Sequence, residues 1–361
     1  MSDDLRRYHR QMLLPGIGES GQRRLGASRV LLAGCGALGC VIADTLVRAG
    51  VGVLRIVDRD VVESTNLQRQ TLYTEADAAE GVPKAEAARR RLSTVNSGVR
   101  IEPVVADLTH ENLEALAGVG GERVSLIMDG LDNFETRYLL NDVAVKHGIP
   151  YVYGGAVGMT GAVYPVLPAT EPGDTAWERA GAAGPDLEML FPEVPAPGTT
   201  PTCDTAGVLG PLISIVAGHQ AAEAIKILTG QWSAVMRTML HVDLMTNRVR
   251  SVDVSAMAEK VEQPRRFRHL EGQGRTGTAV LCGRHAVQLS SASRGVIDLE
   301  GVADRLSGHG SVTANRFLVR VEIVEGEQTY ELTVFSDGRA MVRGTEEPSV
   351  ARAVYARYLG G

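Results

Sequence analysis

The chain has few cysteines, no long hydrophobic run and no surplus of basic residues. No apolar run reaches the roughly 18 residues that a membrane span needs, and the first 30 residues lack the apolar core of a signal peptide. We therefore expect a cytoplasmic protein. The net charge of −6 argues against direct nucleic-acid binding and favours a small molecule or a protein as partner. The four cysteines form no CxxC pair, which argues against a disulfide framework or a self-contained zinc site: Cys35, Cys40, Cys203 and Cys282.

The composition is that of a globular protein. The chain has 361 residues, of which 44% are hydrophobic and 22% charged. This is enough for one large domain and a smaller one.

Strands and helices are predicted to alternate in the first half of the chain. Residues 29–34 form an apolar run typical of a buried strand, 37–49 a helix ended by Gly50, and 53–58 a second buried strand. This alternation predicts an α/β fold with a doubly wound, Rossmann-like, mostly parallel sheet that binds ligands at the carboxyl ends of its strands. The same reasoning predicts helices at 83–96, with Pro83 first, and 133–148, and strands at 124–129 and 151–157.

The pattern changes between Pro168 and Thr205, where seven prolines and little periodicity predict a functional or disordered loop. An apolar helix at 206–230 follows, suited to the core or to a subunit interface. We expect a first domain over 1–255, a linker over 256–274 and a small α+β domain over 275–361. Further strands are predicted at 238–244, 248–254, 278–289, 316–335 and 338–344, and a last helix at 346–359.

A glycine pattern follows the first strand. In VLLAGCGALGC, residues 30–40, the glycines are Gly34, Gly36 and Gly39, and Asp58 ends the next strand nineteen residues later. This is the dinucleotide-binding fingerprint, in which phosphates lie at a helix N-terminus. Alone it is a weak signal, equally compatible with NAD or FAD and with another nucleotide.

Polar residues beyond Asp58 favour a nucleoside triphosphate. A triphosphate site needs cations for the phosphates and a carboxylate for Mg²⁺, and Arg69, Lys84 and Asp132 meet this need if the fold brings their loops together. The polar residues concentrated after the second strand are Asp58, Asp60, Asn66, Gln68, Arg69 and Gln70.

Seven segments in this order resemble the E1-like adenylating enzymes, in particular the ThiF, MoeB and HesA branch. The resemblance covers residues 5–255 and implies ATP and Mg²⁺ as cofactors. It implies adenylation of the C-terminal Gly-Gly carboxylate of a ubiquitin-fold sulfur-carrier protein, similar to ThiS or MoaD, with release of pyrophosphate. The segments are RYHRQ (7–11), GCGALG (34–39), DRD (58–60), TNLQRQ (65–70), PK (83–84), DGLDNFETR (129–137) and TCDTAGVLGPL (202–212).

The resemblance implies a role for each matching residue. Gly36 and Ala37, in the turn with Gly34 and Gly39, allow the backbone to approach the nucleotide, and Asp58, followed by Asp60, accepts hydrogen bonds from the ribose. Asn66 and Arg69 hold phosphates, in a loop that Thr65 and Gln68 also line. The alternatives are a ligand-free turn and a solvated polar loop.

The catalytic charges are also implied by the resemblance. Lys84 lies at the phosphates, although most lysines are solvated surface charges. Asp132, before Asn133, binds Mg²⁺, although this segment could instead supply a helix N-cap. Arg10 reaches the γ-phosphate of a neighbouring subunit, which implies a homodimer. Its alternative is an N-terminal charge in water.

Cys203 matches a sulfur nucleophile that the family uses conditionally, the alternative being a small buried residue at the start of a helix. Cys35 and Cys40 are expected to pack in the core. The chain lacks the two CxxC pairs of zinc-binding relatives, so structural zinc is not expected. Without zinc, the loop is expected either to be stabilised by Trp177 and its apolar neighbours or to be mobile. The role of the C-terminal domain, including the final Gly360 and Gly361, stays open.

Three other functions compete with this hypothesis. The first is E1-like activation of another protein or peptide carboxylate, for conjugation or microcin-type modification. The second is a non-catalytic nucleotide-binding scaffold, which the presence of the charged residues disfavours. The third is an NAD oxidoreductase, for which the sequence offers no hydride-acceptor site.

Overall fold

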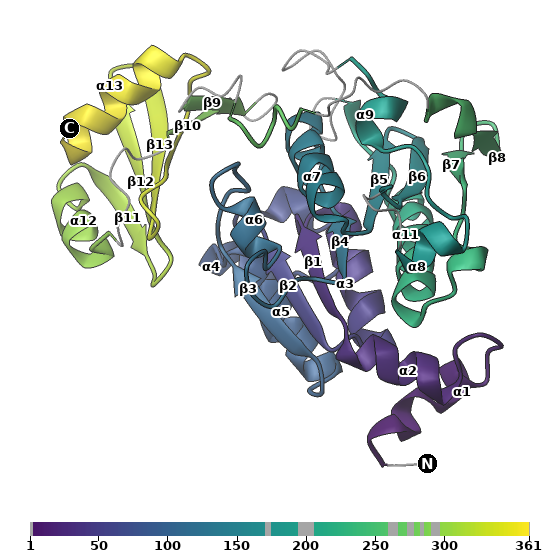
Figure 1. Ribbon diagram of the computed structural model, residues 1–361. Coiled ribbons are helices and arrows are strands. Elements are labelled where there is room, and N and C mark those ends of the chain that lie inside the picture. Colours follow the sequence, from purple (N-terminus) through teal and green to yellow (C-terminus); the bar gives the residue numbers. More distant parts are fainter. Residues whose placement is uncertain are drawn as a thin grey trace. The chain divides into compact units, whose positions relative to one another are not determined.

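The computed structural model divides the chain into two compact units, Met1–Gln273 and Gly274–Gly361 (Figure 1). The structure describes residues 3–169, 175–193, 206–258, 266–272, 278–281, 285–289 and 297–360. Within these ranges no helix is both long and apolar enough to cross a membrane.

The first unit is built on one large sheet. Its described strands are arranged in the order β3-β2-β1-β4-β5-β6-β7-β8. Neighbours are parallel from β3 to β5 and antiparallel from β5 to β8. The predicted mostly parallel, doubly wound sheet is thereby confirmed. The strands are β1 (Arg29–Ala33), β2 (Val53–Val57), β3 (Arg100–Val104), β4 (Leu126–Asp129), β5 (Tyr151–Val157), β6 (Thr160–Val166), β7 (Thr238–Asp243) and β8 (Arg248–Asp253).

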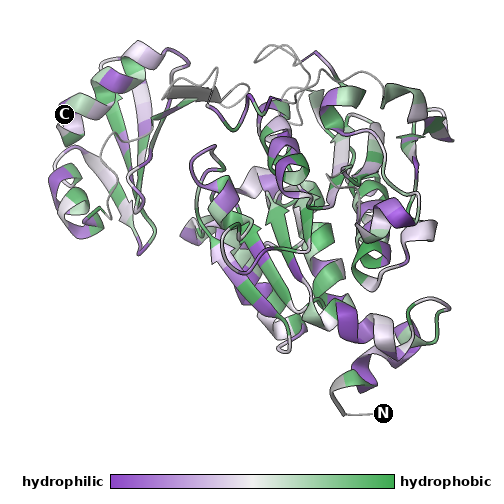
Figure 2. Cartoon of the chain, viewed as in Figure 1, coloured by the Kyte–Doolittle hydropathy of each residue, from purple (hydrophilic) through white to green (hydrophobic). Residues whose placement is uncertain are grey.

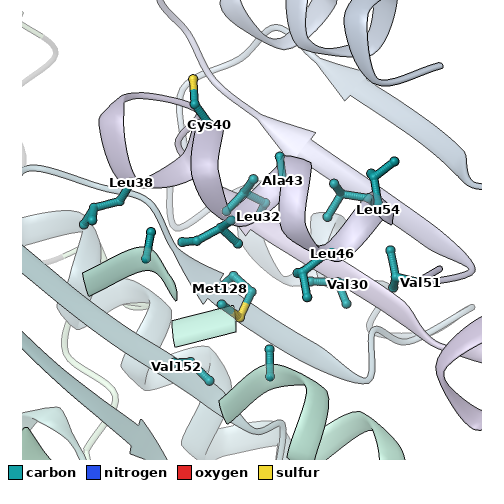
Figure 3. Packing of buried hydrophobic residues seen from close by; sticks show 14 of the residues in the cluster. Val30, Leu32, Leu38, Cys40, Ala43, Leu46, Val51, Leu54, Met128 and Val152 are labelled. Atoms are coloured by element: carbon teal, nitrogen blue, oxygen red, sulfur yellow. The ribbon is translucent and has the colours of Figure 1, made fainter. Parts of the chain in front are cut away.

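Helices cover both faces of this sheet. One buried cluster joins β1 to α3, α5 and α11, and Figure 3 shows Leu32 of β1 and Met128 of β4 packed with Leu46 of α3. A second cluster joins the other face to α6 and α7. The helices of the unit are η1 (Asp3–Tyr8), α1 (His9–Met12), α2 (Gly18–Ala27), α3 (Ala37–Ala49), η2 (Ser64–Asn66), α4 (Glu75–Glu80), α5 (Lys84–Val95), α6 (Leu113–Leu116), α7 (Phe134–His147), α8 (Ala176–Arg179), α9 (Leu187–Leu190), α11 (Gly210–Thr229), η3 (Trp232–Ala234) and η4 (Ser255–Met257).

The hydropathy pattern explains these layers. Figure 2 shows hydrophobic residues concentrated on the central strands and hydrophilic residues on the outer helices. Helices α3 and α7 end at Gly50 and Gly148, as predicted, because both glycines adopt the left-handed conformation that caps a helix. The sequence predicted Pro83 as the first residue of α5. In the structure Pro83 is the N-cap, and the helix begins one residue later, at Lys84.

Two short helices, α8 and α9, lie in the described part of the proline-rich segment. Its residues 170–174 and 194–205 are outside the described part of the chain. The indole Nε1 of Trp177 donates to the carbonyl of Pro168 at 2.9 Å, and its ring packs on Trp232 at 5.5 Å between centroids. Trp177 therefore stabilises the start of the loop, as expected.

Part of the segment predicted as a linker packs on the first unit. The backbone N–H groups of His269 and Leu270 donate to the buried carboxylate of Asp142, and the His269 ring stacks on Tyr138. These contacts fix residues 266–272 on α7.

The second unit is a small α+β fold, as predicted. Its described strands form one antiparallel sheet in the order β11-β12-β13-β14-β10-β9, and a buried cluster joins this sheet to α12 and α13. The elements are β9 (Thr278–Leu281), β10 (Ala286–Leu289), α12 (Leu299–Leu306), β11 (Gly310–Ala314), β12 (Leu318–Glu325), β13 (Gln328–Phe335), β14 (Ala340–Arg343) and α13 (Pro348–Leu359).

Candidate active site

The glycine turn joins β1 to α3 at the carboxyl edge of the sheet. Gly34 has a φ of +84°, and a side chain there would lie 2.9 Å from the carbonyl oxygen of Gly130. A Cβ on Gly39 would lie 2.2 Å from the carbonyl oxygen of Gly34. At Gly36, however, a Cβ would meet no atom closer than 3.8 Å. Internal packing explains the first and third glycines, whereas a Cβ on Gly36 would meet Gln70 and Gly130 only at ordinary contact distances, so packing does not require a glycine there.

This difference predicts that alanine substitution will affect ATP binding at Gly36 and fold stability at Gly39. Gly36→Ala is expected to weaken ATP binding at least about tenfold, because the methyl group occupies the space beside the turn, with little change in thermal stability. Gly39→Ala is expected to destabilise the fold by about 2 kcal/mol or more, because its Cβ collides with the backbone. Calorimetry with ATP and thermal unfolding measure the two effects. Unchanged ATP affinity in Gly36→Ala would show that the space is not used.

The end of β2 holds the turn through Asp58. Its two carboxylate oxygens accept the backbone N–H groups of Cys35 and Asp60, each at 2.7 Å. Burial raises the pKa of the Asp58 carboxyl above its ordinary value, and the nearby Lys84 ammonium acts in the opposite direction. The carboxylate therefore fixes the turn and lies beside a positive charge.

Lys84 is the first residue of α5 and its side chain is only 4% exposed. Its Nζ lies 3.0 Å from Oδ2 of Asp60. The alternative of a solvated surface lysine is therefore wrong. The structure brings Asp58, Asp60 and Lys84 together beside the glycine turn.

The loop 64–70 reaches the glycine turn at Gln70, whose Nε2 would lie 3.8 Å from a Cβ on Gly36. Asn66 is buried and its Oδ1 accepts the backbone N–H of Glu63, whereas Thr65 and Gln68 are exposed. The guanidinium of Arg69 donates to the carbonyl of Thr65 at 3.1 Å. The loop is thus partly built into the fold rather than wholly solvated.

The loop after β4 carries Asp132 and Asn133. Asn133 is the N-cap of α7, since its Oδ1 accepts the backbone N–H of Thr136 at 2.9 Å. The segment therefore supplies a helix N-cap, as the alternative allowed, but through Asn133 and not Asp132, and the Asp132 residue is exposed. Leu131, which precedes it, lies 3.1 Å from a Cβ position on Gly34, so this loop touches the glycine turn.

The structure adds residues that were not assigned to the site from the sequence. Gln70, the last residue of TNLQRQ, is buried beside Gly36, and its Oε1 has no hydrogen-bond partner among the described residues. Asp129 and Arg137, at the two ends of DGLDNFETR, form a buried ion pair at 3.0 Å. The positions of these three residues within the motifs indicated that they could belong to the site. Their burial could not be predicted from the sequence.

Arg10 lies at the other end of α3. The Gln11 side chain donates to the carbonyl of Ala49 at 3.1 Å, and the Tyr8 hydroxyl accepts from Asn96 at 2.8 Å. These two hydrogen bonds hold α1 beside the C-terminal end of α3. Because the 13 residues of α3 span about 20 Å, the exposed Arg10 and the glycine turn of one chain are far apart.

Of the cysteines, Cys35 and Cys40 are buried, which confirms the predicted packing. Cys203 and Cys282 lie outside the described residues, so the nucleophilic role of Cys203 stays a prediction. Within the described ranges, His, Cys, Asp and Glu side chains form no group of three or more that could hold a metal ion.

Known proteins resemble this chain over most of its length. A sulfur carrier protein ThiS adenylyltransferase of Bacillus subtilis is 40% identical over 359 residues, 98% of this chain and 99% of that protein. A sulfur carrier protein adenylyltransferase of Thermus thermophilus is 41% identical over 257 residues, 70% of this chain and 88% of that protein.

Solved structures share the fold. Escherichia coli MccB, crystallised with MccA-N7isoASN, aligns with a TM-score of 0.56 at 20% identity, covering 70% of this chain and 73% of MccB. The model of the ThiF family matches residues 8–263. The chain therefore belongs to the ThiF family, as its motifs predicted.

Proposed function

We propose that this chain is an ATP-dependent adenylyltransferase that activates the C-terminal Gly-Gly carboxylate of a ubiquitin-fold sulfur-carrier protein. The main support is the 40% identity of this chain, over almost its whole length, to an adenylyltransferase named for the carrier ThiS. In the reaction a carboxylate oxygen bonds to the α-phosphorus of ATP. The bond from the α-phosphorus to the oxygen that bridges it to the β-phosphorus breaks, and pyrophosphate leaves.

The glycine turn supports ATP as the substrate. Gly36, where internal packing does not require a glycine, is the N-cap of α3, and backbone N–H groups at a helix N-terminus favour phosphate. Asp58 still has lone pairs for ribose hydroxyls after accepting two backbone N–H groups. Lys84 and Arg69, with Asn66, would then neutralise and orient the phosphates.

Asp132 is the residue that would hold Mg²⁺. Its carboxylate is exposed and is not used as a helix cap, and Mg²⁺ bound to a nucleotide commonly takes only one or two protein carboxylates. The residues present therefore fit the metal. When bound, Mg²⁺ would neutralise charge on the phosphates during the transfer.

A homodimer would complete the site. Arg10 is separated from the glycine turn of its own chain by the length of α3, so a phosphate contact requires the turn of a second copy. The exposed Leu13 and Leu14 follow α1 and provide apolar surface for such a contact.

Mixing two inactive variants tests this arrangement. Arg10→Ala and Asp132→Asn are each expected to lose exchange of pyrophosphate into ATP. Co-expression in equal amounts is expected to restore about a quarter of wild-type activity, because half of random dimers are mixed and each has one complete site. A mixture as inactive as either variant would contradict action in trans. Pairing Arg10→Ala with the Arg10→Ala/Asp132→Asn double variant should restore nothing.

Activation of a different protein or peptide carboxylate is not favoured. The likeness to MccB is at 20% identity and supports the fold alone. A carrier-dependent exchange assay separates the two, since a sulfur-carrier enzyme should respond to carriers ending in Gly-Gly and not to unrelated peptides.

A further inference from the structure

A buried ion pair lies beneath the loop that carries Asp132. The carboxylate of Asp129 is inaccessible and the Arg137 side chain is 5% exposed, with Nε 3.0 Å from Oδ2. Burying two charges costs solvation energy that their attraction often only balances, so such a pair is weak evidence for stability. Its place at the edge of the site suggests another use.

The pair binds both peptide groups of Leu131. Oδ1 of Asp129 accepts the Leu131 N–H at 2.9 Å, and Nη2 of Arg137 donates to the Leu131 carbonyl at 2.6 Å. On either side, the Gly130 N–H donates to the carbonyl of Ala33, and Asn133 caps α7. The backbone is thus fixed on both sides of Asp132, whose own carboxylate is exposed.

The pair is itself held by neighbouring elements. The Tyr151 hydroxyl donates to Oδ2 of Asp129 at 2.8 Å, and Nη2 of Arg137 also donates to the Gly154 carbonyl of β5 at 2.9 Å. From α11, the Gln220 side chain donates to the Asp129 carbonyl at 2.8 Å. The guanidinium lies 5.3 Å from the centroid of the Tyr153 ring. These contacts join β4, β5, α7 and α11 into one rigid support.

We propose that Asp129 and Arg137 are positioning residues that hold the Asp132 carboxylate where the Mg²⁺ of the nucleotide complex binds. This inference rests on the proposed function of Asp132. Neither residue needs to touch the nucleotide. Their loss should therefore reduce the benefit of Mg²⁺ without reducing metal-free nucleotide affinity.

Calorimetry with an ATP analogue that has a methylene group between the α- and β-phosphorus tests this without turnover. The Mg²⁺-dependent gain is the ratio of the Kd without Mg²⁺ to the Kd with it. Arg137→Lys keeps a charge opposite Asp129 but cannot donate to a carboxylate and two carbonyls in one plane. We expect its metal-free Kd to stay within about twofold of wild type and its Mg²⁺-dependent gain to fall at least about fivefold.

A second variant covers the case in which Arg137→Lys does not fold. Asp129→Asn/Arg137→Gln removes both charges together and leaves no unpaired buried ion. The same loss of gain is expected. Arg55→Lys is the matched control, because Arg55 likewise pairs with a carboxylate, that of Glu102, and donates to the Leu116 carbonyl at 2.6 Å. It should keep the wild-type gain.

Two results would overturn the proposal, and they are distinguishable. If the Asp129 and Arg137 variants keep the wild-type gain while Asp132→Asn loses it, the pair does not position Asp132. If Asp132→Asn itself keeps the gain, the metal role of Asp132 is wrong and the positioning role falls with it.

Discussion

Replacing Asp132 by asparagine is expected to lower carrier-dependent exchange of pyrophosphate into ATP at least about 100-fold. The amide has the shape of the carboxylate but lacks the charge that Mg²⁺ requires. Asn133, and not Asp132, caps α7, so the substitution removes no helix cap. The midpoint of thermal unfolding should therefore stay within about 2 °C of wild type.

Glu135→Gln is the matched control for this loss. Glu135 is exposed in the first turn of α7, three residues after Asp132. Its replacement therefore also removes one negative charge near the site. Exchange should stay within about twofold of wild type, as expected for a surface charge. Equal losses in both variants would mean that general electrostatics, and not a specific ligand, explains the effect.

Lys84→Gln is expected to have a similar effect on exchange, again a loss of about 100-fold or more. The ammonium is almost fully buried beside Asp60 and close to the glycine turn, where a phosphate would complete its contacts. Lys146→Gln is the control, since Lys146 also pairs with a carboxylate, that of Glu114, but at the surface near the end of α7. Exchange rates and ATP affinity, measured for both variants, test the difference.

The same substitution should change how stability depends on pH. The pKa of Asp58 is already raised above its ordinary value of 3.8 by burial, and Lys84 opposes this rise. A raised folded pKa of a carboxyl gives stability that is present below the unfolded pKa and lost as the pH rises through the folded pKa. Without Lys84 that loss should grow. The deficit of Lys84→Gln in thermal stability should thus be larger at pH 7 than at pH 4, and an equal deficit at both would contradict this.

The central elements of the fold could be predicted from the sequence because their signals are local. The apolar run of β1, the glycine turn and the capping glycines each specify structure within a few residues. In the first unit two strands were missed for physical reasons. β3 is an edge strand that contains Pro103, and β6 contains Gly161 and Pro165, so neither has the composition typical of a strand.

The second unit shows the same limit. α12 was not predicted, since it is short and carries Gly301 in its interior, which lowers helix propensity. β11 is a mostly exposed edge strand that begins with a glycine, and its pattern lacks buried alternation.

The site residues divide in a similar way. Motifs gave the positions of Lys84 and Asp132, but the burial of Lys84 depends on contacts with Asp60, 24 residues away. The support under Asp132 joins Asp129 to Arg137 and to Gln220, 91 residues away, which only the folded chain reveals.

Exchange of labelled pyrophosphate into ATP by the wild-type protein, with a panel of purified sulfur carriers, tests the central claim most directly. The account predicts exchange with at least one carrier ending in Gly-Gly, and none when that carrier lacks its two final glycines. Exchange that is independent of any carrier, or bound ATP with no exchange for every carrier in the panel, would contradict it.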